Sequence, residues 1–505
     1  MKSIFVFIIS ILILELHSSF AQESYDVNIL KANMEFLASD ALMGRESGTF
    51  YEELSAQFIA SELKKYGVKA FGDEGSYFQS FEVLKNSMSI NSTIKLMAGD
   101  GIVSTTLEPI KDFVGEIVNL NEDILASPLE MVFCGYGITD EVSGYDDYMG
   151  LDLKGKIAVV TFGIPSEKYH DNLTGVNLGR FRSPALKVQV AATAGAEAVF
   201  FVPDELLEQM WGMLAQMTTE DKFTLAGYPP EDSFFPLPAL GLKMERGNEF
   251  FLEEEITFEK IKSLSGEGQK LDKFLMRKKI ILDFDMVKTR GFCKNVVGLI
   301  EGLNKDEVIT IGAHYDHIGK VDSEIFNGAD DNASGTVAIL EAARNLVSGE
   351  QLKRNVAVIF YGAEEKGLLG SRFFAGEWRD KENLIVNINI DMCGRGKVDT
   401  ITVRGPLETS GELFEIVKSI DNESSMDFDL KKGLTDGMGS SDHASFAAVG
   451  IPVIDLCDDM ESDLHMPTDD YDKIDYDKIG KTSTVVEKIV RKISELDHKL
   501  SRETE

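Results

Sequence analysis

Residues 308–340 read VITIGAHYDHIGKVDSEIFNGADDNASGTVAIL, and this stretch decides the fold class. The nearly continuous apolar run from Val308 to Gly312 predicts a strand that is covered on both faces. The amphipathic run from Thr336 to Val347 predicts a helix. Similar apolar runs recur at residues 296–300, 355–361, 384–390 and 451–456. Strands that alternate with helices indicate an α/β domain with a mainly parallel, mixed sheet flanked by helices.

The chain of 505 residues is too long for one hydrophobic core, and the sequence pattern outside this region differs from the alternation of strands and helices. Residues 27–66 carry two apolar stripes at helical spacing around a turn-rich break at 44–48, which predicts two helices. Beyond residue 88, short β-rich runs alternate with Gly and Asp turns. We therefore predict that residues 22–88 and 261–505 form the α/β domain and that residues 89–260 form an inserted β-rich domain.

The first 21 residues have the features of a signal peptide. Lys2 supplies a positive charge, residues 4–14 are apolar, and Ser19-Phe20-Ala21 places small residues at a cleavage site. The apolar run is shorter than the ~20 residues that a spanning helix needs. We predict an exported protein, periplasmic or secreted, whose mature chain starts near Gln22 and has no integral membrane segment.

The amino-acid composition disfavours some classes of binding partner and of metal or redox site. The formal charge is −34 with 43% hydrophobic residues, which is typical of a globular protein that nucleic acid and anionic membranes repel. No C-x-x-C pair occurs, so thiolate zinc and redox motifs find no support. Buried free thiols are expected at the cysteines, which are Cys134, Cys293, Cys393 and Cys457.

Acids and histidines follow the predicted strands directly. Those that come straight after a strand are His314, Glu364, Glu365 and Asp391. Asp330 opens the next helix, where backbone N–H groups can hold a carboxylate, and His465 lies in a loop after the last strand. Ligands of open α/β sheets bind at the carboxyl ends of strands. We therefore expect these side chains to meet at one edge of the sheet.

Imidazole and carboxylate together are a donor set that zinc accepts. An adjacent pair of glutamates is costly to bury unless a cation compensates it. Metals would do so, with one glutamate binding metal while the other stays free as a base.

The order of these segments resembles the M28 family of metallopeptidases. The matching motifs are His-x-Asp at 314–316, Gly-Ala-Asp-Asp-Asn-Ala-Ser-Gly at 328–335, Ala-Glu-Glu-x-Gly-Leu-x-Gly-Ser at 363–371, Ile-Asp-Met at 390–392 and a late histidine. Residues 37–45 and 137–156 resemble members that carry an inserted protease-associated domain. The resemblance covers nearly the whole mature chain and implies a zinc-exopeptidase-like fold.

Carried over by position, the resemblance also implies roles for single residues. Asp330 would bridge two metals, with His314 and Asp391 completing one site. Glu365 and His465 would complete the other site. Glu364 would take a proton from the attacking water, and Asp316 would orient the first histidine.

Other polar residues nearby are given structural interpretations. His317 is expected to be a neighbour of the site rather than a ligand, because a strand's alternating pleat would turn it away from the other ligands. Asp331 would support its turn, Asp442 would cap a helix or support the site, and His443 would be structural. Arg395 could contact a substrate carboxylate, but a structural role is equally expected.

The implied activity is that of an exported exopeptidase with two divalent metal ions, zinc by preference, that removes N-terminal residues from peptides. A glutaminyl cyclase, with a related fold around one zinc, is the first alternative. A glutamate carboxypeptidase would need basic groups that the sequence does not identify. A noncatalytic receptor-like binding protein is disfavoured because the whole ligand set is present. The sequence does not indicate the oligomeric state.

Overall fold

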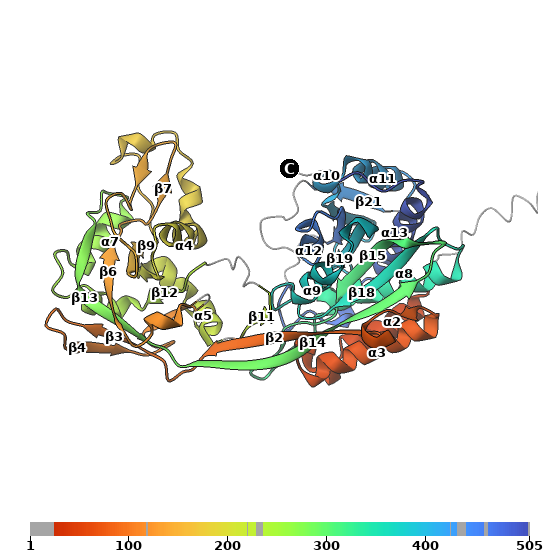
Figure 1. The fold of residues 1–505 in the computed structure, drawn as a ribbon, viewed down its shortest axis with the longest axis horizontal. Helices are drawn as coiled ribbons and strands as arrows, with labels where there is room; N and C mark the ends of the chain where they lie inside the picture. The colour runs from red at the N-terminus through yellow and green to blue at the C-terminus, as the bar shows by residue number, and fades with distance from the viewer. Residues whose placement is uncertain are drawn as a thin grey trace, which may run out of the picture. The chain divides into compact units, whose positions relative to one another are not determined.

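The computed structural model describes residues 25–117, 120–219, 221–228, 236–424, 426–431, 441–458 and 463–502. The chain divides into two compact units, which are unit 1 (Met1–Val83 with Gly291–Glu505) and unit 2 (Leu84–Arg290) (Figure 1). The predicted signal peptide, residues 1–21, lies outside the described residues. Among the helices described, none is both long enough and apolar enough to cross a membrane.

Unit 1 is built on a mixed sheet whose central strands are parallel. Its neighbouring strands are, in order, β14 (Met286–Ile300), β18 (Arg354–Tyr361), β15 (Asn304–His314), β19 (Leu384–Asp391), β22 (Val453–Cys457), β20 (Thr400–Arg404) and β21 (Asp427–Leu430). The run from β18 to β22 is parallel, whereas β14 and β20 are antiparallel to their inner neighbours. The predicted mixed α/β fold is confirmed.

Both faces of this sheet are covered. Along β18, Val356 and Val358 face one hydrophobic cluster, and Ala357 and Ile359 face another. The first cluster includes residues of α2 (Val27–Leu37), α3 (Phe50–Tyr66), α8 (Gly335–Ser348), α11 (Gly411–Asp421) and α13 (Tyr476–Glu495). The second includes residues of α9 (Leu369–Glu377) and α12 (His443–Ala447). This double coverage explains why the strands read as continuous apolar runs.

Unit 2 holds an eight-stranded sheet. Its strands are, in order, β4 (Val103–Leu107), β3 (Thr93–Met97), β13 (Phe274–Asp283), β6 (Pro128–Phe133), β9 (Ile157–Thr161), β10 (Ala198–Val202), β12 (Ala239–Leu242) and β5 (Phe113–Glu116). Its helices include α4 (Pro184–Thr193), α5 (Glu205–Thr219) and α7 (Phe258–Gly266).

The boundary between the units differs from the prediction on the return side. Because β13 pairs with both β3 and β6, unit 2 extends to Arg290 rather than ending at residue 260. The chain passes from unit 1 into unit 2 along β2 (Phe78–Met88) and returns along β14.

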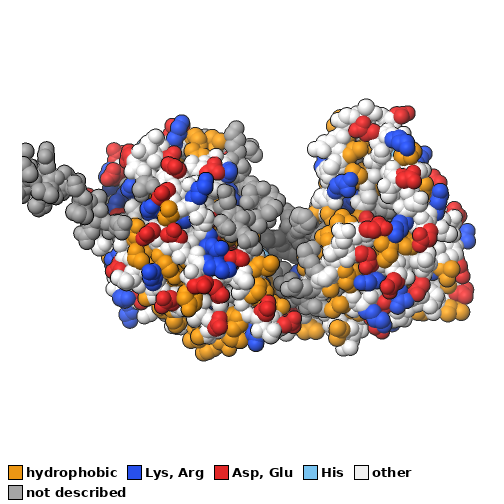
Figure 2. All heavy atoms as spheres, turned by 180° about the vertical axis from the view of Figure 1, so that it is seen from behind, with side chains coloured by type: hydrophobic (Ala, Val, Ile, Leu, Met, Phe, Trp, Pro, Cys, Tyr) orange, Lys and Arg blue, Asp and Glu red, His pale blue; other side chains and the backbone are white. Residues whose placement is uncertain are grey.

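The surface and the cysteines agree with the composition. Figure 2 shows Asp and Glu side chains interspersed with Lys and Arg over the visible face of each unit. All four cysteines are buried free thiols, as predicted.

Candidate metal centre

Three parallel strands bring the predicted site residues to one edge of the sheet of unit 1. Strand β15 ends at His314, which is in register with Tyr361 at the end of β18. Strand β19 ends at Asp391, and Glu364 with Glu365 follows β18 after a short turn. The side chains therefore converge because parallel strands present their carboxyl ends together.

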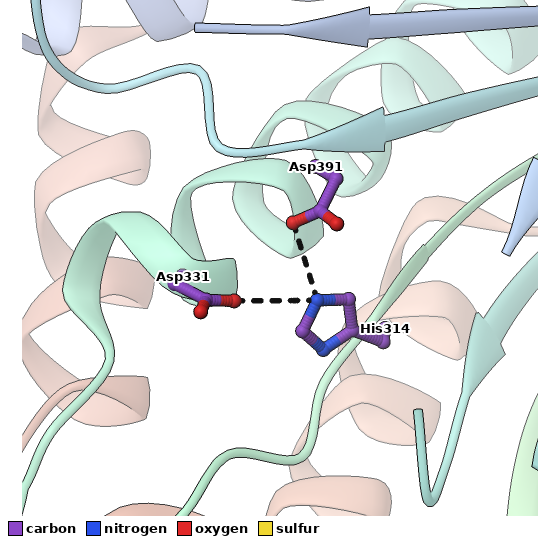
Figure 3. Close-up of side chains that lie close together, drawn as sticks. All are labelled: His314, Asp331 and Asp391. Carbon is purple, nitrogen blue, oxygen red and sulfur yellow. Dashed lines mark hydrogen bonds and ion pairs between the residues drawn. The ribbon is translucent and has the colours of Figure 1, made fainter. Parts of the chain in front are cut away.

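One group of donors surrounds the ring of His314. Its Nε2 lies 3.2 Å from Oδ1 of Asp391 and 3.4 Å from Oδ1 of Asp331, and Figure 3 shows the ring turned toward both carboxylates. Its Nδ1 lies 3.2 Å from the carbonyl oxygen of Asp316. An Nδ1–H that donates to this carbonyl leaves Nε2 free to bind a cation.

A second group lies on the other side of Asp331. Its Oδ2 is 3.2 Å from Nε2 of His465 and 3.8 Å from Nδ1 of His317. Glu365 joins both histidines, with Oε1 2.7 Å from His317 Nδ1 and Oε2 3.4 Å from His465 Nε2. The two oxygens of Asp331 thus face two different sets of donors.

Asp331, rather than Asp330, stands between the histidines. Oδ1 of Asp330 accepts a hydrogen bond from the backbone N–H of Gly394 at 2.7 Å, and no described residue donates to its Oδ2. The backbone leaves helical geometry at Asp331 (φ −103°, ψ 96°), so the two neighbouring carboxylates point different ways. Asp469 fixes this loop by accepting from the N–H groups of both acids at 3.0 and 3.1 Å.

Glu364 reaches the centre without occupying it. Its Oε2 lies 3.9 Å from Nε2 of His314. Asp316 accepts from the N–H of Glu364 at 3.0 Å, from the N–H of Glu365 at 3.3 Å and from Ser47 Oγ at 2.6 Å. Its carboxylate therefore holds the glutamate loop, while its carbonyl oxygen contacts the first histidine.

The protonation behaviour reflects an excess of buried acid. Burial raises the pKa of Glu364 well above its usual value, and Glu365 and Asp391 add to the rise while His314 opposes it. Hydrogen bonds to Asp331 and Glu365 raise the pKa of His465 to about 10. Imidazoles that must hold protons to balance neighbouring carboxylates mark a place where a metal cation fits. The nitrogen and oxygen donors are those that zinc accepts.

Two residues that the sequence interpretation leaves out of the ligand set lie within the site. His317 is fully buried and contacts Glu365, because β15 ends at His314 and the strand pleat does not extend to it. Asp331 was expected only to support its turn. A histidine three positions after a strand-end histidine, with acids around it, is a signal that could have indicated the first of these.

The remaining candidates lie outside these two groups. Nδ1 of His443 is 3.3 Å from Asp455, which supports a structural role. Asp442 precedes α12 but makes no side-chain capping bond. Arg395 forms an ion pair with Asp463 at 3.0 Å.

Comparison with known proteins agrees with the site. Residues 295–490, which contain every residue of both groups, match the profile of Peptidase family M28. Aminopeptidase YwaD of Bacillus subtilis (strain 168) is 25% identical over 470 residues, covering 89% of this chain and 81% of the relative. Leucine aminopeptidase 1 of Ajellomyces capsulatus (strain NAm1 / WU24) is 31% identical over 202 residues, covering 36% of this chain and 51% of the relative.

Two solved structures share the fold over nearly the whole chain. An aminopeptidase from Aneurinibacillus sp. strain AM-1 has a TM-score of 0.58 at 21% identity and covers 95% of this chain and 96% of that one. BSAP, a zinc aminopeptidase from Bacillus subtilis, has a TM-score of 0.53 at 20% identity and covers 94% and 96%.

Proposed function

We propose that this chain, a hydrolase of the M28 peptidase type, is an exported aminopeptidase that works with two zinc ions. One observation carries the proposal: the two carboxylate oxygens of Asp331 face separate groups of histidine and acid donors. When bound, the metals lower the pKa of water and polarise the scissile carbonyl.

The donors divide into two sets around Asp331. His314 and Asp391 would hold one metal, and Glu365 and His465 the other. Asp331 would bridge them, which moves the bridging role from Asp330 to its neighbour. The geometry of the loop supports this revision, because Asp330 points toward the N–H of Gly394 instead.

Glu364 is the proposed general base. It lies 3.9 Å from His314, and its raised pKa suits a carboxylate that accepts a proton from the attacking water and passes it to the leaving amine. The N–H of Glu364 is held by Asp316, so the backbone at the base is fixed.

His317 is proposed to orient Glu365. An Nδ1–H that donates to Oε1 at 2.7 Å leaves Oε2 turned toward His465. A neighbour that fixes a ligand's orientation raises metal affinity without binding the metal itself.

The free N-terminus is the proposed recognition element of the substrate. Relatives are named aminopeptidases, and a centre rich in carboxylates can hold an ammonium group. Unit 2 would act as a protease-associated domain, and residues 1–21 as the export signal. Blocking the amine would leave acids unpaired at a cost of about 1–3 kcal/mol or more.

A pair of peptides tests the activity. The unblocked peptide should be shortened from its N-terminus, and its N-acetylated copy should stay intact, as measured by mass spectrometry with metal content determined in parallel. Equal trimming of both peptides, or shortening from the C-terminus, would refute the aminopeptidase and favour a carboxypeptidase. One tightly held metal with pyroglutamyl formation would favour the cyclase. A protein without bound metal or turnover would favour a receptor-like role.

A further inference from the structure

Arg45 buries a whole guanidinium next to the metal centre, in unit 1. The residue is 1% exposed. Its Nε donates to the carbonyl oxygen of Tyr315 at 2.9 Å, and its Nη2 donates to that of Gly328 at 3.0 Å. Its Nη1 donates to the carbonyl oxygens of Leu37 at 2.5 Å and Asn327 at 2.6 Å. Backbone oxygens therefore occupy most of the donors of this side chain.

Three of these carbonyl groups belong to the segments that carry metal donors. Tyr315 follows His314 directly in the chain. Asn327 and Gly328 lead into the turn that presents Asp331. A single planar fork thus ties the segment after His314 to the segment before Asp331, and its rigidity fixes their separation.

The neighbours of Arg45 in the chain contact the same region. The backbone N–H of His317 donates to the carbonyl oxygen of Arg45 at 3.3 Å. Ser47 Oγ donates to Asp316 at 2.6 Å. The segment therefore contacts the histidine loop through side chains and through the backbone.

Close packing keeps this segment in place. Gly44 has φ +75°, and a Cβ there would lie 2.4 Å from the carbonyl oxygens of Gly319 and Phe326. Only glycine fits such an approach, so Gly44 lets the chain enter deeply enough for Arg45 to reach the loops.

The guanidinium also brings charge. Burial lowers the pKa of Arg45 to about 10, and Asp316, Asp331 and Asp469 oppose the fall. The side chain therefore remains charged at neutral pH, close to the carboxylates that would face each other without a metal.

We propose that Arg45 is a positioning residue of the metal centre, which sets the affinity for the metals by holding the backbone around His314 and Asp331 at a fixed separation. The inference rests on the proposed metal centre. It assigns a function to the N-terminal segment, which lies outside residues 295–490 that match the family profile.

The test measures Co²⁺ affinity of the full, metal-free chain by visible absorption, with circular dichroism and thermal unfolding on the same samples. Arg45→Lys keeps the charge but loses the fork, and Arg45→Met loses both. We expect both variants to bind Co²⁺ roughly 10-fold more weakly or worse, which is the size of effect known for groups that orient ligands. Where Arg45→Met does not fold, Arg45→Lys decides the question.

Arg354 is the matched control. It is 2% exposed, and it also donates hydrogen bonds to backbone oxygens, namely that of Ile493 and that of His498 at 2.6 Å. It forms an ion pair with Glu307 as well. It lies at the start of β18, whereas the metal centre lies beyond the end of that strand. Arg354→Lys and Arg354→Met should lower the unfolding temperature while Co²⁺ affinity stays within about twofold of wild type, because the hydrogen bonds and the ion pair that they remove lie at the far end of β18.

Unchanged affinity in Arg45→Lys, or equal losses in the Arg45 and Arg354 variants, would overturn the positioning role while the metal centre stands. Wild-type protein that binds no Co²⁺ would overturn the centre and the inference together.

Discussion

Lys187 in unit 2 and Glu364 in unit 1 are both buried ionisable groups, yet their surroundings differ. Nζ of Lys187 donates to the carbonyl oxygens of Thr161 and Gly163, each at 2.6 Å. Its partners thus come from the end of one strand, β9, and the loop that directly follows it. Burial instead raises the pKa of Glu364 well above its usual value, and Glu365 and Asp391 add to the rise while His314 only opposes it.

This difference separates structural from functional burial of charge. Lys187 has local backbone partners, so its burial is explained by folding alone. The acids of unit 1 converge from separate elements, and no described donor reaches Oδ2 of Asp330 beside them. A cluster that folding leaves electrostatically incomplete is a candidate for a bound cation, whereas a satisfied buried charge is not.

The largest expected effect is on turnover. Glu364→Gln should keep the metals and the fold and lose about 10²–10⁴-fold in kcat, since it removes proton transfer and little else. Glu365→Gln should instead lose metal. Steady-state kinetics with elemental analysis of both variants checks this, and loss of metal in the first variant with retention in the second would reverse the two roles.

Asp331→Asn should weaken metal binding by more than roughly 100-fold, because it removes a charge that both metal sites share. This loss is larger than the loss caused by removing a residue that only orients a ligand. Asp330→Asn should cost no more than roughly 10-fold. An amide oxygen at that position can still accept from Gly394. Competition with a chelator measures both constants, and the opposite ranking would return the bridging role to Asp330.

Removing the metals should destabilise one unit. At metal concentrations about 100 times Kd, the loss is about 2.7 kcal/mol. Each unit contains one tryptophan, Trp378 in unit 1 and Trp211 in unit 2. In Trp211→Phe, Trp378 is the remaining tryptophan and reports on unit 1. In Trp378→Phe, Trp211 remains and reports on unit 2. Chelation should therefore shift the unfolding that fluorescence detects in Trp211→Phe only. An equal shift in both would contradict a centre confined to unit 1.

His317→Ala should weaken one metal site by roughly 10-fold, and His317→Gln should recover part of the loss because its amide can still donate to Glu365. His498, which contacts Glu412 at 2.6 Å on the surface, provides the control. His498→Ala should leave Co²⁺ affinity unchanged. If His317→Gln were no better than His317→Ala, a direct ligand role for the ring would replace the orienting role.

Lys187→Met should leave metal content and turnover intact and destabilise unit 2 by about 1–3 kcal/mol, since two carbonyl groups lose their donor. Burial lowers the pKa of Lys187 to about 7, below its ordinary value, so the unfolded chain holds the proton more tightly. Stability of unit 2 should therefore rise as pH increases from about 7 toward 10 in the wild type. The variant should lack this slope, as urea unfolding of the Trp378→Phe background would show.

The fold of unit 1 could be predicted because its strands are buried on both faces. Val356 to Tyr361 alternate between two cores, so the whole run is apolar in the sequence. The extent of unit 2 could not be predicted, because β13 is half exposed and carries Arg277 and Lys279 on its outer face. These charges interrupt the apolar pattern, so the sequence analysis ends the inserted domain at residue 260, before this strand.

The site was predictable to the level of the loop. His314 and Asp391 end their strands, so the sheet alone brings them together. The choice between Asp330 and Asp331 depends on backbone angles inside one turn, and adjacent identical side chains carry no pattern that reveals them. The contribution of Arg45 was hidden for another reason: it acts through carbonyl oxygens, which every residue possesses.

The passage of the chain through β2 and β14 has a consequence for biosynthesis. The two ends of unit 1 at the insertion lie side by side, since a Cβ on Gly291 would lie 3.5 Å from Val83 Cγ2. Unit 2 is continuous in the chain, whereas unit 1 is interrupted by it. The ribosome therefore completes unit 2 before it synthesises β15, β18 and β19. Until then, α2 and α3 have no sheet to pack against. Unit 2 can therefore fold before the sheet of unit 1 is complete.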